Sequence, residues 1–481
     1  MSEARELPGK ILVAGAGLTG VLAAAALRRA LPATDVTVLS TPPEPAAFAD
    51  HASSALPFSS RFLETLGLAE AGIVARCGGS HRLLTRYRGF AAPDLPLAAP
   101  YGAVTDPALL TGFARDWGGG RAGADTAEAP GSLAQILAEA GRYQPGLPGV
   151  EHALRWHPGA LRDFAIALAQ SLGVEHRQGR IGAVRLGSEG QAEAYAIEGA
   201  GEISADLFID CTGPAASLLA QMPMARRIDW SDHLPIRQVL TGRPEQPMLS
   251  LEDRVTLTGA GWLHELAGRD GLQRMLGVAP YADEAAILEA LGGEPVGGAS
   301  FVPGRADKAW IGNVIALGDA AALFDPLPGL NADFAHRQIA LLLELLPGRA
   351  IIPGEREEFN RRTALMADGA RDIVAAHYLA PESDERFGKV AVSEELALSI
   401  DQYTRRGRTP FFEEAPLSEA ERGGLYSALG LERGHGSLPS EDGDTAARQF
   451  AAQARALLDK APPYQKWMAS VLDRSREATR G

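Results

Sequence analysis

A strand, a glycine-rich turn and a helix follow one another at the start of the chain, and this order constrains the fold more than any other feature. Residues 10–14 form a short apolar run, residues 15–20 read GAGLTG, and residues 21–30 have the composition of a buried helix. A second apolar strand is predicted at 35–39. A strand–helix–strand unit joins parallel strands, so the sequence predicts an α/β fold with a Rossmann-like parallel sheet.

Each glycine of the G-x-G-x-x-G turn has its own task in binding a dinucleotide. Gly15 permits the tight turn, Gly17 lets the backbone approach a diphosphate, and Gly20 allows the helix to pack closely on the strand. The diphosphate is expected at the amino end of the helix, where free N–H groups and the helix dipole favour an anion. Ser40 occupies the position at which an acidic residue would bind the ribose hydroxyls, so a weaker hydroxyl contact is expected there.

A second glycine-containing turn lies late in the chain, between a buried strand expected at 313–317 and a helix expected at 332–346. It resembles the second flavin motif of FAD-dependent hydroxylases and their relatives. The resemblance implies that Asp319 binds the ribityl chain of FAD, and that the helix dipole stabilises the anionic reduced ring. Alternatively, Asp319 only caps the turn. The residues expected to bind FAD here are Gly318, Asp319, Pro326, Gly329, Leu330 and Asn331.

The remaining pattern predicts a second, mostly antiparallel sheet and a helical carboxyl-terminal part. Alternating segments at 254–257 and 273–278 favour the antiparallel sheet, and helices are predicted at 355–377 and 446–460. The expected organisation is FAD-binding segments at 1–90, 151–235 and 304–350, a loop-rich insertion at 91–150, a substrate-side sheet at 236–303 and a helical region at 351–481.

Composition excludes several classes of function. The formal net charge is −14 at pH 7, with no basic stripe, so we do not expect nucleic-acid binding. Cys77 and Cys211 have neither metal-type nor disulfide-framework spacing, which predicts no metal and a reducing compartment. No apolar stretch reaches the ~20 residues of a membrane span, and residues 1–10 contain no apolar signal core. These features predict a cytoplasmic protein without a membrane partner.

The electron source is predicted to be external. The glycine run at 118–123 follows no predicted strand and is interpreted as a loop, so the sequence shows no second dinucleotide motif for a nicotinamide. Reduced flavin is therefore expected from a separate flavin reductase.

Four segments, in one common order along nearly the whole chain, resemble the flavin-dependent tryptophan halogenase family. They are 205–213 (ADLFIDCTG), 229–235 (DWSDHLP), the stretch from Gly304-Arg305 to Asn313, and 372–378 (DIVAAHY). The resemblance implies that reduced FAD and O₂ oxidise chloride or bromide. It also implies that the hypohalous acid travels along a tunnel to a catalytic lysine beside a small aromatic substrate.

The residues that carry halogenation in the family are replaced here. Within 77–82 (CGGSHR), Arg82 stands at the family's lysine, and a guanidinium offers no lone pair for a haloamine. Pro328 stands at the catalytic glutamate, and Leu330 at the threonine that contacts halide. His264 stands at the second tryptophan of the family's Trp-x-Trp-x-Ile-Pro motif. The turn has thereby moved toward the hydroxylase form.

The candidate catalytic residues are Arg82, His81 and His264, since histidine can exchange protons near neutral pH. Alternatively, His81 is a surface or structural residue, and His264 is a surface residue on an edge strand. The leading hypothesis is an FAD-dependent monooxygenase acting on an aromatic or other planar substrate. The alternatives are a halogenase with Arg82 in place of lysine, and a flavin-binding accessory protein without turnover. A homodimer remains an open alternative.

Overall fold

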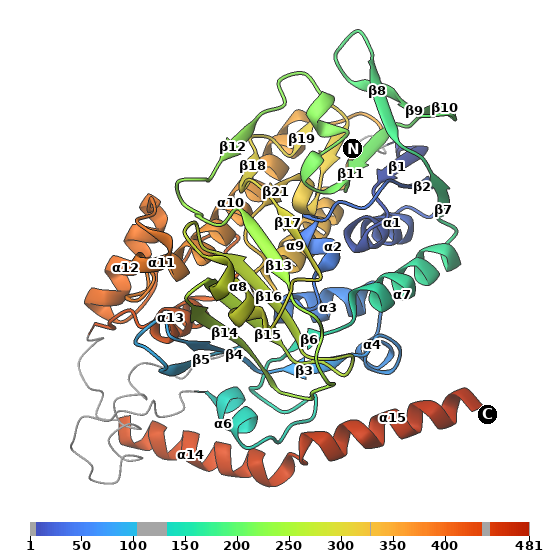
Figure 1. Ribbon diagram of the computed structural model, residues 1–481. Helices are drawn as coiled ribbons and strands as arrows, with labels where there is room; N and C mark the ends of the chain where they lie inside the picture. The colour runs from blue at the N-terminus through green and yellow to red at the C-terminus, as the bar shows by residue number, and fades with distance from the viewer. Residues whose placement is uncertain (1–5, 103–131, 328, 435–442, 481) are drawn as a thin grey trace. The chain divides into compact units, whose positions relative to one another are not determined.

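The computed structural model describes residues 6–102, 132–327, 329–434 and 443–480 (Figure 1). The chain divides into two compact units, each assembled from three stretches. The first unit contains residues 1–78, 156–239 and 298–371, and the second contains 79–155, 240–297 and 372–481. Part of the insertion expected at 91–150, its glycine run at 118–123, and Pro328 lie outside the described residues.

The first unit is built on a six-stranded sheet in the order β19-β20-β11-β1-β2-β7. All neighbouring strands are parallel except the β19–β20 pair. The four residues of β11 are all buried, as expected for a central parallel strand. The strands are β1 (Lys10–Ala14), β2 (Asp35–Ser40), β7 (Glu175–Gln178), β11 (Leu207–Asp210), β19 (Trp310–Ile311) and β20 (Val314–Ala316).

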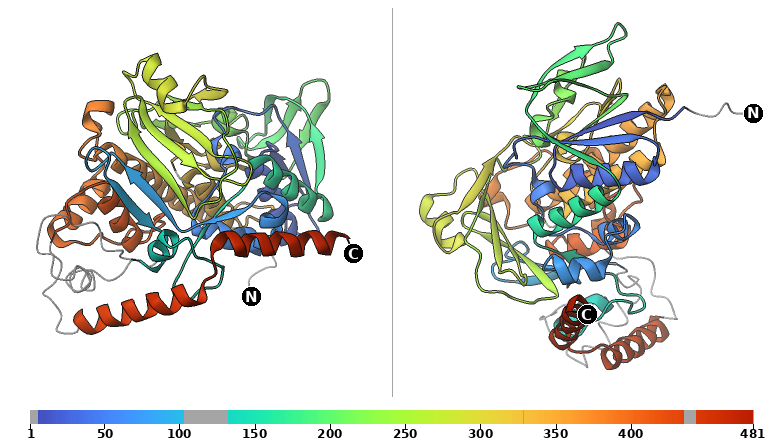
Figure 2. Two further views of the ribbon diagram at one scale, coloured as in Figure 1. Left: turned by 60° about the horizontal axis from the view of Figure 1, so that its bottom comes forward. Right: turned by 90° about the vertical axis from the view of Figure 1, so that its right-hand side faces the viewer.

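Helix α1 (Leu18–Ala30) is the central helix of this unit. Its residues 18–27 are all buried, and it packs against both α7 (Pro158–Ser171) and α9 (Leu330–Glu344). Figure 2 shows α1 and α7 side by side along the sheet. Small side chains allow this close packing, because alanine and glycine make up much of the sequence LTGVLAAAALRRA of α1.

The first unit also contains short helices and two small sheets. The helices are α2 (Phe48–His51), α3 (Pro57–Thr65), α4 (Glu70–Arg76), η1 (Gly213–Ala215), η2 (Leu219–Gln221) and η3 (Gly318–Ala320). The small sheets are β10-β9-β8 (Gly201–Ser204, Ala192–Ile197, Ile181–Leu186) and β12-β18-β21 (Arg227–Asp229, Gly304–Ala306, Ala322–Leu323).

The second unit contains most of a seven-stranded sheet in the order β17-β13-β16-β15-β14-β4-β5. Its β14–β15, β15–β16 and β4–β5 pairs are antiparallel, and β4 pairs with β14 in parallel. The strands are β4 (Leu84–Arg88), β5 (Pro96–Pro100), β13 (Gln238–Thr241), β14 (Glu252–Thr258), β15 (Gly261–Leu266), β16 (Gln273–Val278) and β17 (Gly297–Ser300).

A two-stranded ribbon and several helices complete the second unit. In the ribbon, β3 (Ser80–Arg82) pairs with β6 (Ala153–Arg155) in antiparallel fashion. The helices are α6 (Leu133–Glu139), α8 (Glu284–Leu291), α11 (Asp384–Phe387), α12 (Glu394–Arg406), α13 (Glu419–Ala428), α14 (Gly443–Lys460) and α15 (Tyr464–Arg480). Helix α10 (Pro353–Tyr378) begins in the first unit and ends in the second.

The predicted fold class is confirmed: a parallel Rossmann-like sheet, a mostly antiparallel second sheet and a helical carboxyl-terminal region. The edge-strand alternative for His264 is wrong, because β15 lies between β14 and β16 and His264 is buried. Within the described residues, no helix combines the length and apolar character needed to cross a membrane.

Candidate functional site

The first glycine turn has the backbone geometry that a dinucleotide-binding turn requires. Gly15 has a φ of +98°, and a side-chain carbon there would lie 2.1 Å from the carbonyl oxygen of Cys211. Gly15 N–H donates to the carbonyl of Leu39 on β2, at 2.9 Å, which fixes the turn at the carboxyl end of the sheet. Gly17 is the N-cap residue of α1 and leaves its first turn without a side-chain cap of its own.

A carboxylate that sequence reasoning missed lies at this helix terminus. Thr19 N–H donates to Asp50 Oδ1 at 2.8 Å, and a side-chain carbon at Gly17 would lie 1.8 Å from Asp50 Oδ2. Burial raises the pKa of Asp50, and the hydrogen bonds from Thr19 partly offset the rise. The Asp50 carboxylate therefore lies against the backbone that the sequence assigns to the diphosphate.

The second glycine turn begins at Gly318, which has a φ of +59° and donates its N–H to Gln338 Oε1 at 2.7 Å. The next residue, Asp319, is buried and accepts Ala49 N–H through Oδ2 at 2.7 Å. Burial and, to a lesser extent, the charge of Asp50 raise the pKa of Asp319 well above its ordinary value. Asp319 is thus a buried polar group oriented by α2, rather than an exposed turn cap.

The rest of the second turn leads into α9. Gly329 is the N-cap of α9 with a φ of +76°, and a side-chain carbon there would lie 2.8 Å from the backbone of Ala55. Leu330 and Asn331 are buried in the first turn of the helix, and Asn331 Nδ2 donates to the carbonyl of Phe324. Pro326 is buried as well. Ser40 ends β2, where its carbonyl accepts Gly179 N–H at 3.1 Å.

Helix α2 links the two turns, since Ala49 contacts Asp319 and Asp50 contacts Thr19. The two motifs recognised in sequence therefore belong to one region of the first unit. Their backbones suit a flavin dinucleotide: glycine at each close approach, and a helix amino end at each turn. The Asp50 side chain lies on this path, and it is only half-buried.

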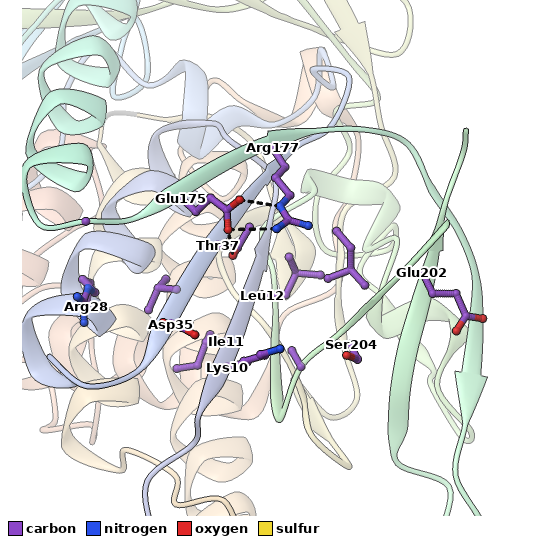
Figure 3. Close-up of a pocket in the computed structure, with 14 residues that line it drawn as sticks. Lys10, Ile11, Leu12, Arg28, Asp35, Thr37, Glu175, Arg177, Glu202 and Ser204 are labelled. Atoms are coloured by element: carbon purple, nitrogen blue, oxygen red, sulfur yellow. Dashed lines mark hydrogen bonds and ion pairs between the residues drawn. The ribbon is translucent and has the colours of Figure 1, made fainter. Parts of the chain in front are cut away.

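A polar cavity of 540 Å³ in the same unit is not a candidate flavin site (Figure 3). It lies at the amino ends of β1 and β2, between residues such as Lys10 and Asp35, and includes the exposed Glu175–Arg177 ion pair. Ligands of open α/β sheets bind at the carboxyl ends of the strands, which is the opposite edge.

In the second unit, Arg82 lies in a buried polar network. Its guanidinium Nη1 contacts Asp253 Oδ2 on β14, and both side chains are at most 1% exposed. Thr85 Oγ1 donates to Asp253 Oδ1 at 3.0 Å, and the guanidinium lies over the Tyr101 ring at 5.4 Å. Burial alone would raise the pKa of Asp253, but Arg82, His264 and Thr85 together hold it below its ordinary value. Asp253 is therefore a carboxylate at neutral pH.

His264 shares this carboxylate. Its Nε2 lies 2.9 Å from Asp253 Oδ2. An ionised Asp253 can only accept a hydrogen bond, so Nε2 carries the hydrogen and Nδ1 of the neutral ring carries the lone pair. An Asp–His pair of this form is how enzymes orient a histidine as a general base. The structure thus brings together two of the three candidate catalytic residues, Arg82 and His264, through an aspartate that the sequence did not indicate.

His81 lies apart from this pair. Side chains alternate along β3, so His81 and Arg82 project to opposite faces. His81 Nδ1 lies 2.9 Å from Tyr464 Oη, which also accepts His81 N–H at 2.8 Å. Three further rings surround it, from Tyr143, His152 and Trp467. These contacts give His81 a packing role between β3 and α15.

The segment 372–378, which resembles the family, contacts the strand that contains His264. Trp262 Nε1 donates to Tyr378 Oη at 3.1 Å, joining β15 to the end of α10. The neighbouring His377 lies 3.1 Å from Tyr87 Oη, and burial lowers the pKa of His377 to about 4. His377 is neutral at physiological pH and is held within the core.

The fold and the two turns define an FAD-dependent oxidoreductase with a Rossmann-like flavin unit. The chain belongs to the tryptophan halogenase family, whose model matches residues 10–419. FAD is the cofactor of this family.

Individual relatives cover nearly the same length. The tryptophan 6-halogenase of Streptomyces toxytricini is 25% identical over 96% of this chain and 98% of its own. The tryptophan 7-halogenase of Lentzea aerocolonigenes is 25% identical over 85% of this chain and 84% of its own. The structure of a flavin-dependent halogenase from Xanthomonas campestris superposes with a TM-score of 0.85 at 22% identity, over 97% of this chain and 98% of that one.

Proposed function

We propose that this chain halogenates a small aromatic substrate, using FAD that a separate reductase has reduced. The membership of the tryptophan halogenase family supports halogenation over the monooxygenation that the replaced residues suggested. The observation that carries the proposal is the match of the family model to residues 10–419. In this chain, the buried Asp253 carboxylate orients His264 as the base that the reaction needs. Reduced FAD, when bound, would supply two electrons that reduce O₂ to the peroxide level, and oxygen at that level can take two electrons from the halide.

The overall reaction balances in atoms and charge, and His264 has the role of a base in its last step. Reduced FAD, O₂, one halide ion, one proton and one aromatic C–H give oxidised FAD, an aryl halide and two water molecules. Hypohalous acid delivers the halogen to a ring carbon and releases its oxygen as water. The ring proton at that carbon then has to leave, and Nδ1 of His264 accepts it.

Arg82 acts as a positioning residue in this proposal. Its guanidinium is engaged with Asp253, stays protonated, and cannot form the haloamine that a lysine would form. It keeps Asp253 ionised, and the ionised carboxylate fixes the tautomer of His264. The lysine of the family is thereby replaced by a three-residue arrangement with a different task.

Monooxygenation is the second candidate, favoured by the same closed Arg82–Asp253 ion pair. A hydroxylation also needs a base, and His264 would serve it equally.

One assay separates the two candidates. The chain is incubated with reduced FAD, O₂ and an indole and phenol panel, with and without bromide or chloride, and products are identified by mass spectrometry. Halogenation predicts halide-dependent products with the bromine isotope pattern. Hydroxylated products alone, in the presence of halide, would overturn it in favour of monooxygenation.

A further inference from the structure

Two adjacent residues of the short helix α2 form hydrogen bonds with the two flavin motifs, one residue with each motif. Ala49 N–H donates a hydrogen bond to Asp319 Oδ2. The resemblance assigns the Asp319 carboxylate to the ribityl chain of FAD. Asp50 Oδ1 accepts a hydrogen bond from Thr19 N–H. This N–H lies at the amino end of α1, where the diphosphate is expected. Both motifs are thus internally paired by residues of the chain itself.

The Asp50 carboxylate has the two properties by which a phosphate binds a helix terminus: negative charge and acceptor oxygens directed at free N–H groups. Its Oδ2 is so close to Gly17 that no side-chain carbon would fit between them. A diphosphate approaching the same glycine would meet a second anion within a few ångströms, in a partly desolvated site where repulsion is strong. The two anions cannot occupy this position together.

We propose that the Asp50 carboxylate is an internal occupant of the diphosphate site, which FAD displaces when it binds, so that Asp50 weakens the affinity for FAD. The inference depends on FAD as the cofactor and is independent of whether the product is halogenated or hydroxylated. A weakly held flavin suits a chain whose flavin is reduced elsewhere, because the cofactor then enters and leaves at every turnover.

The surroundings of Asp50 allow this exchange. Helix α2 has four residues and no side-chain cap, and Asp50 is half-buried, so a small rearrangement frees the carboxylate. Arg162 Nε donates to the carbonyl of Ala16 in the glycine turn at 2.6 Å. Burial raises the pKa of Asp50, and the charge of Arg162 is among the smaller effects that lower it. Once Asp50 has left, Arg162 remains beside the turn as a counter-ion for the diphosphate.

The test is an equilibrium titration of the full chain with oxidised FAD, followed by flavin fluorescence and by quenching of the tryptophans. Asp50→Asn removes the charge and keeps an acceptor for Thr19 N–H. We expect it to bind FAD about tenfold more tightly than the wild type, the size expected for one charge at a helix terminus in a partly buried site. Asp50→Ser, which is shorter and neutral, is a second variant with the same expected direction.

Asp35→Asn is the matched control. It removes the same charge from the same unit, but from an exposed position at the amino end of β2, so its dissociation constant should equal that of the wild type. Melting of each FAD-free variant establishes that it is folded. Folded Asp50 variants that bind FAD no more tightly than the Asp35 control overturn the inference. A tighter dissociation constant without any halogenated product would leave it standing and contradict only the proposed function.

Discussion

Arg82 and His264 contact the same atom, Oδ2 of Asp253, from β3 and β15. A guanidinium and an imidazole thus share one buried carboxylate. The first three predictions separate what this three-residue group contributes to stability from what it contributes to the reaction.

The first prediction concerns the buried cation. Asp253→Asn leaves Arg82 charged and buried, and should destabilise the protein by about 3–5 kcal/mol. The double change Arg82→Met with Asp253→Asn should cost clearly less, because no cation is left without its counter-charge and the amide still serves Thr85. Chemical unfolding of the single and double variants measures the difference. If the loss of unfolding free energy in the double variant equals the sum of the losses in the two single variants, the cation left without its carboxylate is not the main cause of the destabilisation.

The second prediction concerns the base. His264→Gln keeps a donor for Asp253 but cannot accept a proton, so turnover should fall by about 100-fold or more. FAD affinity and melting temperature should be nearly unchanged. His81→Gln is the matched control, because it alters a buried histidine of the same unit on the other face of β3. If both variants lose turnover equally, His264 has no special role as the base.

A third prediction tests Arg82 as a positioning residue through the pH dependence of the rate. Burial would raise the pKa of Asp253 if Arg82 were absent, whereas the native pair holds it below its ordinary value. Removing the cation in Arg82→Met should therefore move the acid limb of the pH–rate profile to higher pH. Arg82→Lys, which retains a charge, should restore most of the native profile. A purely structural role for Arg82 would lower the rate at all pH values without moving the limb.

The fourth prediction concerns acid stability. Burial lowers the pKa of His336 to about 3, from an ordinary value of 6.5. As the pH falls below about 6.5 the unfolded chain takes up this proton first, so stability should decrease by about 1.4 kcal/mol per pH unit until the folded pKa is reached.

Melting curves between pH 7 and 4 check this effect. His336→Gln cannot titrate and should show a shallower loss of melting temperature over that window. His51→Gln, an exposed histidine on α2, serves as the control and should follow the wild type. Identical slopes for all three proteins would mean that folding does not lower the pKa of His336.

The parts of the fold that the sequence predicted best are those with local signals. β1 was predicted at its observed bounds because an apolar run ends at glycine, and β16 because its residues follow an alternating pattern. Helix α1 begins three residues earlier than predicted, at Leu18, because residues 18–20 of the glycine turn already have helical geometry. Helix α9 likewise begins at Leu330 rather than 332, directly after the left-handed Gly329.

The two aspartates that organise the candidate sites gave no such signal. Asp253 reaches Arg82 only through the parallel pairing of β4 with β14 and the position of β3, contacts between residues far apart in sequence. Asp50 lies in a four-residue helix with no motif, and its importance depends on lying over Gly17. Sequence patterns predict elements, whereas these contacts depend on how the elements pack.

The most direct test of the account is a crystal structure of the chain grown with FAD. We predict that diphosphate oxygens accept N–H groups of residues 17–20, Thr19 included, and that the Asp50 carboxylate has moved away from Thr19. FAD bound with its diphosphate elsewhere, while Asp50 still accepts Thr19 N–H at 2.8 Å, would contradict the assignment of this glycine turn as the flavin site.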